Sequence, residues 1–495
     1  MRYNNHRFGD FASHFVSCKE MVIIMKFPFL NTDNEDINRA YRLAISTVAC
    51  NTVNRHGRDK KNDGEVLLAG LNYDSPWTRD TSINTWNGCG LICPEITENT
   101  LKTLLIKTEK GYSAGELVGQ CWDVIIWAIG AWYQYLYTGN KEFLTFARDA
   151  VINTMEAFES NEFDSEKNLF RGAACYGDGI AAYPDRYAVY GESGIANYIE
   201  AVNGSNEALG IPIYTLSTNC LFYYAYVILD KMAAELGLKE QYDEKAKNMY
   251  EAINRTFWSE EKGNYIYMVD ETGICDSEEG LGISFALLFG LADKQKQEKI
   301  FRNQHITPRG IACLWPSFER YRVDNDSYGR HSGTVWPFIQ GFWADAAATL
   351  GRTDLFDNEF KNETENALQS NQFAEIYHPE TGIPYGGLQE RKGKMAKWDS
   401  MPVQTWSATA YLRNVLMDLL GMKFDVDGIH FKPCGTMLAG DITAEGICYR
   451  NAVLDISVKG HGGVKSFKLD GEETQPFLPA DTCGKHTVEI ILEAC

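Results

Sequence analysis

Apolar residues recur at every third or fourth position through most of the chain, from about residue 34 to residue 421. This spacing is typical of amphipathic helices, and one stretch begins with Pro94, which suits a first helical turn. Short polar or glycine turns such as Thr138-Gly139-Asn140 divide the stretches into pairs. The pattern predicts eleven helices, over 34–53, 94–107, 120–140, 141–160, 215–238, 241–258, 281–291, 294–303, 334–352, 353–370 and 403–421. The segment 81–90 is expected to supply a twelfth.

The two members of each pair differ in their polar content. First members such as 215–238 and 334–352 are apolar on all sides, whereas second members such as 241–258 carry many charged residues. A helix that is apolar all round must be buried on all sides. We therefore predict two concentric rings of helices rather than an open solenoid, for which the repeat lengths are too irregular.

The pattern changes after Gly421. Segments such as GIHFKPCG and HTVEIILEA alternate apolar and polar residues between glycines and aspartates, which is typical of strands. We predict an irregular leader over 1–30, a helical domain over 31–421 and a small all-β domain, a sandwich, over 422–495.

Composition and charge narrow the function classes. The net charge of -20 over 495 residues repels nucleic acid. The leader lacks a convincing secretion signal and the chain lacks a long apolar run, so a cytoplasmic protein without a membrane span is predicted. The 13 cysteines, among them Cys50 and Cys220, show no zinc-type spacing and are expected to be free thiols.

No cofactor or metal is predicted. The acidic stretch 324–329 lacks the rest of a calcium loop and is interpreted as a turn. No glycine-rich phosphate loop stands out either. The sequence leaves the oligomeric state open, a homo-oligomer included.

Candidate chemistry lies in long segments between the helices, at 55–93, 161–212, 304–331 and 372–401. The stretch SPWTRDTSINTWNG (75–88) holds two indoles and an Arg-Asp doublet. An indole offers a flat apolar plate to a sugar ring, and charged groups bind sugar hydroxyls bidentately. These residue types make a carbohydrate the expected ligand. Their position in a long loop agrees with this, because long loops in compact domains are usually functional.

Four stretches together resemble a known family. Trp77-Thr78-Arg79-Asp80, WDVIIWAIGAWYQYLYTGN, FAEIYHPETG (373–382) and VQTWSATAYL (403–412) are similar, in order and spacing, to motifs of the six-hairpin (α/α)6-barrel glycosidases. That group includes amylo-α-1,6-glucosidases, processing α-glucosidases and trehalases. The resemblance implies a mainly α fold, an (α/α)6 toroid, with the small β-sandwich domain behind it.

The resemblance also implies the two catalytic residues. Inverting hydrolysis needs one protonated carboxyl at the leaving oxygen and one carboxylate that activates water on the opposite face. Glu375, in the FAEIYHPETG segment, is the predicted base, and Asp178, between two glycines, is the predicted acid. Helix-end capping by Glu375 and a turn at Asp178 are the structural alternatives. Asp123, Asp185 and Glu192 are rival acids.

Further residues are predicted to bind the substrate. The resemblance implies that Arg79 and Asp80 bind sugar hydroxyls at the closed end of the pocket, which selects exo-action. It also implies that Trp77 forms a wall of that pocket. The full predicted set of substrate-binding residues is Trp77, Arg79, Asp80, Trp122, Asp123, His331, Trp336, Tyr377, Gln404 and Trp406.

The sequence therefore predicts an inverting exo-glycosidase that removes an α-linked glucose-type sugar. An inverting phosphorylase is a second interpretation, which the Glu375 motif disfavours because phosphate replaces the activated water. A sugar-binding protein without turnover is a third. A sugar epimerase would need a histidine pair, which the nine histidines do not offer.

Overall fold

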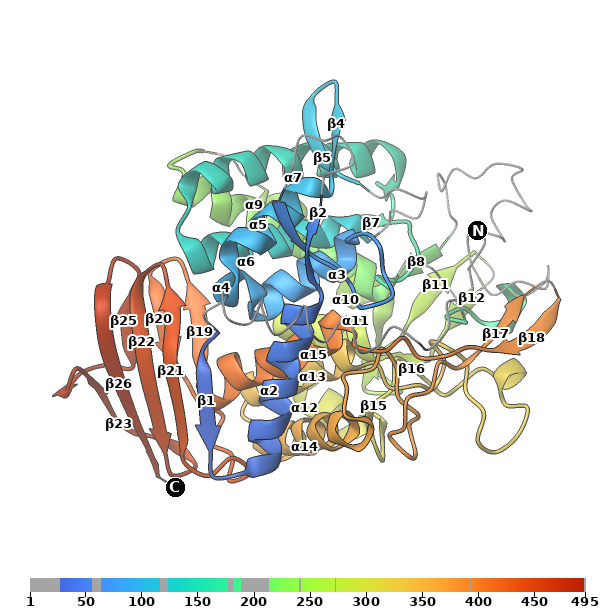
Figure 1. Ribbon diagram of the computed structural model, residues 1–495. Helices are drawn as coiled ribbons and strands as arrows, with labels where there is room; N and C mark the ends of the chain where they lie inside the picture. Colours follow the sequence, from blue (N-terminus) through green and yellow to red (C-terminus); the bar gives the residue numbers. More distant parts are fainter. Residues whose placement is uncertain are drawn as a thin grey trace.

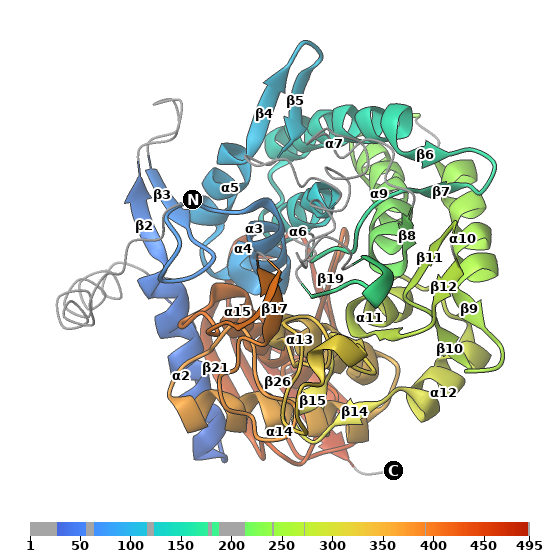
Figure 2. The ribbon, with the colours of Figure 1, turned by 90° about the vertical axis from the view of Figure 1, so that its right-hand side faces the viewer.

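The computed structural model describes residues 27–55, 64–115, 123–176, 181–187, 213–239, 242–271, 273–391 and 393–493. Its centre is a closed ring of helices, in which each contacts the next and the last contacts the first. Figure 2 shows these helices around a common centre. They are α3 (Thr78–Asn84), α6 (Trp127–Thr138), α9 (Leu216–Glu235), α11 (Gly280–Leu288), α13 (Pro337–Thr349) and α15 (Thr405–Arg413).

A second set of helices packs outside this ring (Figure 2). It consists of α2 (Glu35–Cys50), α5 (Pro94–Thr103), α7 (Lys141–Asn161), α10 (Asp243–Phe257), α12 (Lys294–Asn303) and α14 (Thr353–Ser370). Burial follows the sequence pattern: the residues Pro337–Ala348 of α13 are all buried, whereas α12 buries only Ile300. The predicted arrangement of two concentric helical layers is confirmed.

The helix ends have recognisable local causes. The Asn140 side chain accepts a hydrogen bond from the Phe143 N–H and so caps α7. Just before it, Gly139 ends α6 with a left-handed φ of 68°, which a glycine adopts without strain. Pro94 and Pro337 open α5 and α13, where a missing N–H costs nothing.

The segment 81–90 does supply the twelfth helix, as α3 continued by a π-helical turn, Thr85–Cys89, and by α4 (Gly90–Ile92). Several helices begin or end a few residues inside their predicted bounds, as α2, α9 and α13 do, and the helix predicted over 94–107 differs in kind at its end. The stretch 94–107 is helical only to Thr103, and β4 (Leu105–Thr108) then pairs with β5 (Gly111–Ala114). The β4 residues after Leu105 are exposed, so no apolar face holds them in a helix.

The loops between helices form short two- or three-stranded pieces. These are β2 (Thr52–Arg55) with β3 (Gly64–Leu67), β6 (Phe163–Asp164) with β7 (Leu169–Phe170), β8 (Ile213–Thr215) with β11 (Met268–Asp270) and β12 (Gly273–Cys275), β9 (Trp258–Ser259) with β10 (Asn264–Tyr265), β13 (Glu278–Glu279) with β16 (Leu314–Trp315), β14 (Ile306–Thr307) with β15 (Gly310–Ile311), and β17 (Leu388–Arg391) with β18 (Lys394–Lys397). Figure 1 shows β16, β17 and β18 on one side of the helices and the C-terminal strands on the other.

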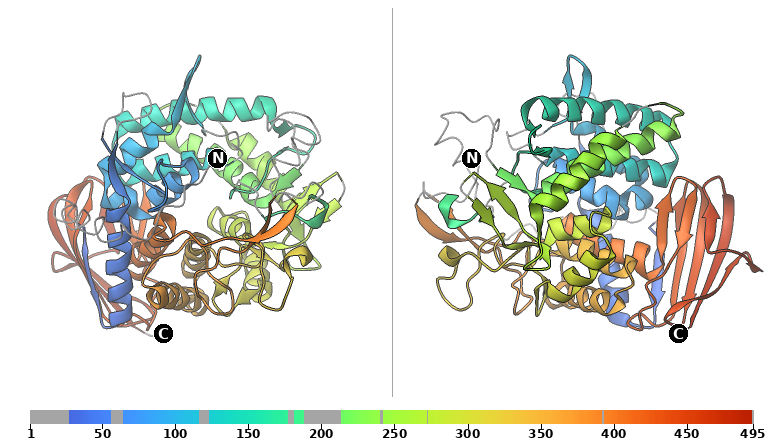
Figure 3. Two further views of the ribbon diagram at one scale, coloured as in Figure 1. Left: turned by 45° about the vertical axis from the view of Figure 1, so that its right-hand side comes forward. Right: turned by 180° about the vertical axis from the view of Figure 1, so that it is seen from behind.

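The C-terminal region is rich in strands, as the alternation predicts (Figure 3). A six-stranded sheet has the order β1-β21-β22-β26-β23-β24 and a three-stranded sheet the order β19-β20-β25. Burial along β26 alternates residue by residue after Thr487. The strands are β1 (Phe29–Thr32), β19 (Met422–Asp425), β20 (Gly428–Phe431), β21 (Ile442–Tyr449), β22 (Asn451–Lys459), β23 (Gly463–Leu469), β24 (Glu472–Glu473), β25 (Phe477–Pro479) and β26 (Cys483–Glu493).

The predicted leader, 1–30, includes the first two residues of a strand. Phe29 and Leu30, which the pattern placed in the leader, begin β1, and β1 pairs antiparallel with β21. One buried apolar cluster runs from α2, α14 and α15 into both C-terminal sheets. The boundary at 421 thus crosses continuous packing, and the division into domains stays a prediction.

The cysteines depart from expectation at one position. Cys50, the last residue of α2, is disulfide-bonded, so the prediction of a free thiol is wrong there. Helical periodicity gave no sign of it, because a disulfide depends on where the chain brings a second sulfur. The remaining described cysteines, Cys220 included, are free thiols. Within the described residues, no helix is long and apolar enough to cross a membrane.

Candidate active site

Glu375 lies in the loop between α14 and α15, with 3% of its surface exposed. Arg330 Nη2 donates a hydrogen bond of 2.7 Å to Glu375 Oε2, and the Met401 N–H donates one of 3.2 Å to the same oxygen. The Glu375 N–H in turn donates to the Met401 carbonyl at 2.9 Å. The side chain therefore has a fixed orientation, and no described residue donates to its other oxygen, Oε1.

Asp80 lies in the first turn of α3 and is 5% exposed. Gln404 Nε2, at the start of α15, is 3.5 Å from Asp80 Oδ1. The neighbouring Arg79 forms an ion pair with Asp123, and its guanidinium lies 5.8 Å from the centre of the Trp406 ring. The structure thus brings together the five predicted binding residues Arg79, Asp80, Asp123, Gln404 and Trp406.

The electrostatics join Asp80 to Glu375. Burial raises the pKa of Asp80 to about 7, the Arg79 charge lowers it, and the Glu375 charge raises it. Tyr73 shares this environment: burial raises its pKa, the charges of Glu375 and Asp80 raise it further, and the Arg330 charge lowers it. The charges of Asp80, Arg330 and Glu375 therefore shift the pKa values of Asp80 and Tyr73, so these four side chains share one electrostatic environment.

Sequence reasoning missed Tyr73. It stands four residues before Trp77, in the same long loop, and it is partly exposed. A phenol offers both a flat ring and a hydroxyl, the combination that marked the stretch 75–88 as sugar-binding. The aromatic residue just upstream of Trp77 is therefore the sequence signal for this position.

The raised pKa of Asp80 predicts a measurable pH dependence. Between its ordinary value of 3.8 and about 7, folded Asp80 keeps a proton that the unfolded chain has lost. The unfolding free energy therefore falls as pH rises through this window, by up to about 4 kcal/mol. We expect Asp80→Asn to gain that stability relative to the wild type between pH 4 and pH 8, measured by urea unfolding. The exposed Asp74→Asn is the control, and parallel pH profiles for all three proteins would contradict the prediction.

Aromatic rings form a stack beside Glu375. The His331 ring lies between Tyr176 and Trp336, with centroid distances of 5.1 and 4.4 Å. Trp336 Nε1 donates to the Arg330 carbonyl at 2.9 Å, and its ring meets Trp406 edge-on at 5.8 Å. His331, Trp336 and Trp406 thus come together around Arg330. Tyr176, also part of the stack, was not predicted; it precedes Gly177 in the glycine-rich loop.

Tyr377 supports the Glu375 loop from behind. Its hydroxyl accepts a hydrogen bond of 2.9 Å from the Ala374 N–H and donates one of 2.9 Å to the Gln372 carbonyl. Both partners are main-chain groups just before Glu375 in the sequence, so the Tyr377 hydroxyl is already committed to holding this loop. Trp77 stands at the N-cap of α3 and is partly exposed.

The predicted acid and one wall residue lie outside the described residues. These are Asp178 and Trp122, together with the rival Glu192. The other two rival acids are described. Asp123 is paired with Arg79, and Asp185, 56% exposed in its side chain, is paired with Arg320 at 2.6 Å. An arginine partner suits a carboxylate rather than a proton donor.

Glu279 is a buried carboxyl that no motif indicated. It stands at the N-cap position of α11 without a capping hydrogen bond from its side chain, is fully buried, and accepts a hydrogen bond of 3.0 Å from the Ser217 N–H. Burial raises its pKa to about 8, although the Ser217 bond and Tyr176 lower it. Glu279 is therefore mostly neutral at pH 7 behind the Tyr176 ring. An isolated Glu-Glu pair before an apolar helix carries no sequence signal for this position.

Nothing among the described residues groups three metal-ligating side chains. The stretch 324–329 forms the expected turn, in which Asp324 Oδ1 accepts hydrogen bonds from the Asp326 N–H at 2.9 Å and Ser327 Oγ at 2.6 Å.

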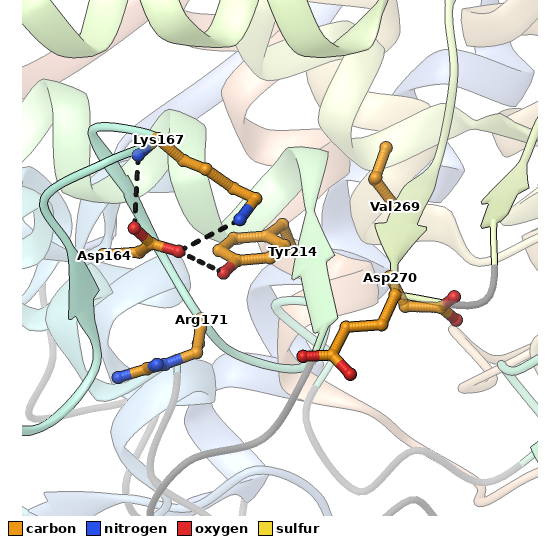
Figure 4. A pocket seen from close by; sticks show the side chains of 7 residues that line it. Asp164, Lys167, Arg171, Tyr214, Val269 and Asp270 are labelled. Carbon is orange, nitrogen blue, oxygen red and sulfur yellow. Dashed lines mark hydrogen bonds and ion pairs between the residues drawn. The ribbon is translucent and has the colours of Figure 1, made fainter.

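A cavity of about 250 Å³ lies away from these residues, between β6–β7 and β8–β11 (Figure 4). Tyr214 Oη donates to Asp164 Oδ2 at 2.6 Å. Burial acts to raise the pKa of Asp164, but the hydrogen bonds from Tyr214 and Lys167 outweigh it and lower the pKa to about 2. Asp164 therefore holds no proton at neutral pH, and none of the predicted site residues lines this cavity.

Comparison with known proteins places the chain in a family. A profile for the mannosylglycerate hydrolase MGH1-like glycoside hydrolase domain matches residues 123–392. No curated protein matches the chain in sequence.

Solved structures show the same fold at low identity. A sialidase matches with a TM-score of 0.67 and 11% identity, over 88% of this chain and 38% of the sialidase chain. The GH63 mannosylglycerate hydrolase from Thermus thermophilus, in complex with glucose, matches with a TM-score of 0.58 and 12% identity, over 76% of this chain and 100% of its own. A GH78 family rhamnosidase of a Bacillus species matches with a TM-score of 0.58 and 15% identity, over 94% of this chain and 44% of its own. The chain thus spans well under half the length of the sialidase.

The family match covers more than half of the chain and includes Arg330, His331, Trp336 and Glu375. The ring of helices fits the (α/α)6 toroid of its structural neighbours. The chain therefore belongs to the MGH1-like glycoside hydrolase domain family, within the six-hairpin glycosidases.

Proposed function

We propose that this protein is an inverting, exo-acting glycoside hydrolase that removes an α-linked glucose-type sugar, with Glu375 as general base and Asp178 as general acid. The observation that carries the proposal is the setting of Glu375. Its Oε2 is held by Arg330 and by the Met401 N–H, whereas no described residue donates to Oε1. An oriented carboxylate with one uncommitted oxygen suits the activation of a water molecule.

In the proposed reaction, Oε1 of Glu375 takes a proton from water as the water oxygen bonds to the anomeric carbon. The bond from that carbon to the leaving oxygen breaks, and the Asp178 carboxyl gives its proton to this oxygen. Attack from the face opposite the leaving group inverts the anomeric configuration. Asp178 is assigned from the sequence motif. Asp123 and Asp185 are disfavoured as acids because each already pairs with an arginine.

The sugar is proposed to lie between the carboxylates and the residues of α3 and α15. Arg79, Asp80 and Gln404 would bind its hydroxyls, with Tyr73 as a further hydroxyl partner. Arg79 is held in place by its ion pair with Asp123 and lies beside Trp406, which supports its proposed role in binding a terminal sugar residue and so supports exo-action.

The test is hydrolysis of a substrate panel by the purified chain. p-Nitrophenyl α-D-glucopyranoside and α-linked glucose disaccharides should release glucose, at rates that added phosphate does not change. The corresponding α-mannosides separate the glucose-type proposal from a mannose-type one. Phosphate-dependent release of a sugar phosphate, or binding without turnover, would contradict the proposed hydrolase.

A further inference from the structure

Glu279 is a fully buried carboxyl that the proposed reaction does not use. Its Oε2 accepts a hydrogen bond of 3.0 Å from the N–H of Ser217, in the first turn of the inner helix α9. A Cβ atom at position 282 would collide with this oxygen, so Gly282 gives the carboxyl its room. The carboxyl is thus built into the start of α9, where the helix offers N–H groups that have no partner within the helix.

The first turn of α9 also holds the segment that leads to Tyr176. The Cys175 N–H donates a hydrogen bond of 3.0 Å to Ser217 Oγ. Just before this turn, Thr215 Oγ1 donates one of 3.1 Å to the Gly172 carbonyl. The buried carboxyl at the start of α9 therefore acts on the same turn that sets the position of Tyr176.

Two buried oxygen atoms face this place without a partner of their own. Glu279 Oε1 and Tyr176 Oη are both buried, and neither forms a hydrogen bond of ordinary length with a described residue. Tyr176 nevertheless lowers the pKa of Glu279, as a hydroxyl that faces a carboxyl does. A buried polar atom is costly to leave unpaired, so these two oxygens are best satisfied by each other.

The Tyr176 ring begins the stack that leads to Glu375. The planes of Tyr176 and His331 differ by 16°, and those of His331 and Trp336 by 14°. The Arg330 guanidinium lies 5.5 Å from the centre of the Trp336 ring, and Trp336 Nε1 donates to the Arg330 carbonyl. Arg330 in turn donates to Glu375. A change in the position of the Tyr176 ring therefore reaches the proposed base through a short series of contacts.

From these contacts we infer that Glu279 is a positioning residue for the glycosidase site. Its carboxyl holds the start of α9 through the Ser217 N–H and the Tyr176 hydroxyl through Oε1, and so fixes the ring stack that orients Arg330 and Glu375. Glu279 is fully buried and acts through Tyr176 rather than on the sugar. The inference rests on the proposed function, in which Glu375 is the general base.

The test measures the ring stack and the reaction separately, in the full chain. The two flanking rings shift the NMR signals of the His331 ring protons, which are identified by their loss in His331→Asn. Steady-state kinetics on p-nitrophenyl α-D-glucopyranoside gives kcat. We expect Glu279→Ala to move the His331 signals and to lower kcat by about 10- to 100-fold. Glu279→Gln keeps an oxygen for the Ser217 N–H and should stay within about threefold of the wild type.

Glu363→Ala is the matched control. Glu363 is likewise a buried carboxyl that accepts a hydrogen bond, from Asn414 Nδ2 at 2.7 Å, next to the last residue of α15. Its removal should cost stability without moving the His331 signals or kcat. Thermal unfolding of each variant establishes that it is folded.

Tyr176→Phe tests the same inference even if Glu279→Ala does not fold. It keeps the ring and removes only the hydroxyl, so it should move the His331 signals in the same direction and lower kcat severalfold. Unchanged His331 signals in either variant overturn the positioning role. So does an equal effect of Glu363→Ala, or a loss in Glu279→Gln as large as in Glu279→Ala. A wild type that hydrolyses no α-glucoside overturns the proposed function instead, and the His331 signals then still decide whether Glu279 fixes the stack.

Discussion

Replacing Glu375 by Gln should lower kcat by about 10² to 10⁴-fold, with KM nearly unchanged. The amide keeps an oxygen that can accept from Arg330 and the Met401 N–H, so the loop geometry should persist. What is lost is the ability to take a proton from water. Steady-state kinetics on p-nitrophenyl α-D-glucopyranoside measures both parameters, and thermal unfolding checks the fold.

Glu380→Gln is the matched control for this substitution. Glu380 belongs to the same loop motif but is exposed, and it should retain wild-type kinetics. A Glu375→Gln variant that works at near wild-type rate would remove Glu375 from the mechanism. A large rise in KM with kcat unchanged would assign Glu375 to substrate binding instead.

Replacing Asp178 by Asn should produce a loss that depends on the leaving group. A general acid matters most when the leaving oxygen is a poor leaving group, as in a disaccharide, and least for p-nitrophenolate, which departs without protonation. We expect kcat to fall by about 10² to 10⁴-fold on α-linked disaccharides and by much less on the p-nitrophenyl glycoside. Comparing the two substrates in one variant makes the measurement independent of overall damage to the site.

Asp185→Asn is the control for the acid, since Asp185 is exposed and pairs with Arg320. It should behave as the wild type on both substrates. Equal losses of the Asp178 variant on both substrates would place Asp178 in binding or folding rather than in proton transfer. Leaving-group dependence in Asp185→Asn would make that residue the acid and the present assignment wrong.

Helical periodicity predicted the helical part of the fold well. Burial on all sides distinguishes inner from outer helices in the sequence, and α13 and α12 show the same contrast in the structure. The end of α5 and the strand Phe29–Thr32 were missed for a common reason. The strand β1 depends on β21, a partner far along the chain, and the end of α5 depends on the hairpin of β4 and β5. A local hydrophobic pattern encodes neither.

The candidate site was predictable where a motif supplied the residue. Arg79, Asp80, Gln404 and Trp406 gather as expected because they start helices that neighbour each other in the ring. Tyr73, Tyr176 and Glu279 escaped because their positions depend on loop conformation and on burial. The pairing of Glu375 with Arg330, 45 residues apart, is likewise a tertiary contact with no local signal.

Proton NMR of the first product tests the central claim most directly. The signal of the anomeric proton is followed during rapid hydrolysis of an α-glucoside, before mutarotation mixes the anomers. If Glu375 activates a water molecule opposite the leaving oxygen, β-glucose should appear first and α-glucose only later. Initial release of α-glucose would mean retention, and it would contradict the assignment of Glu375 as the base of an inverting hydrolase.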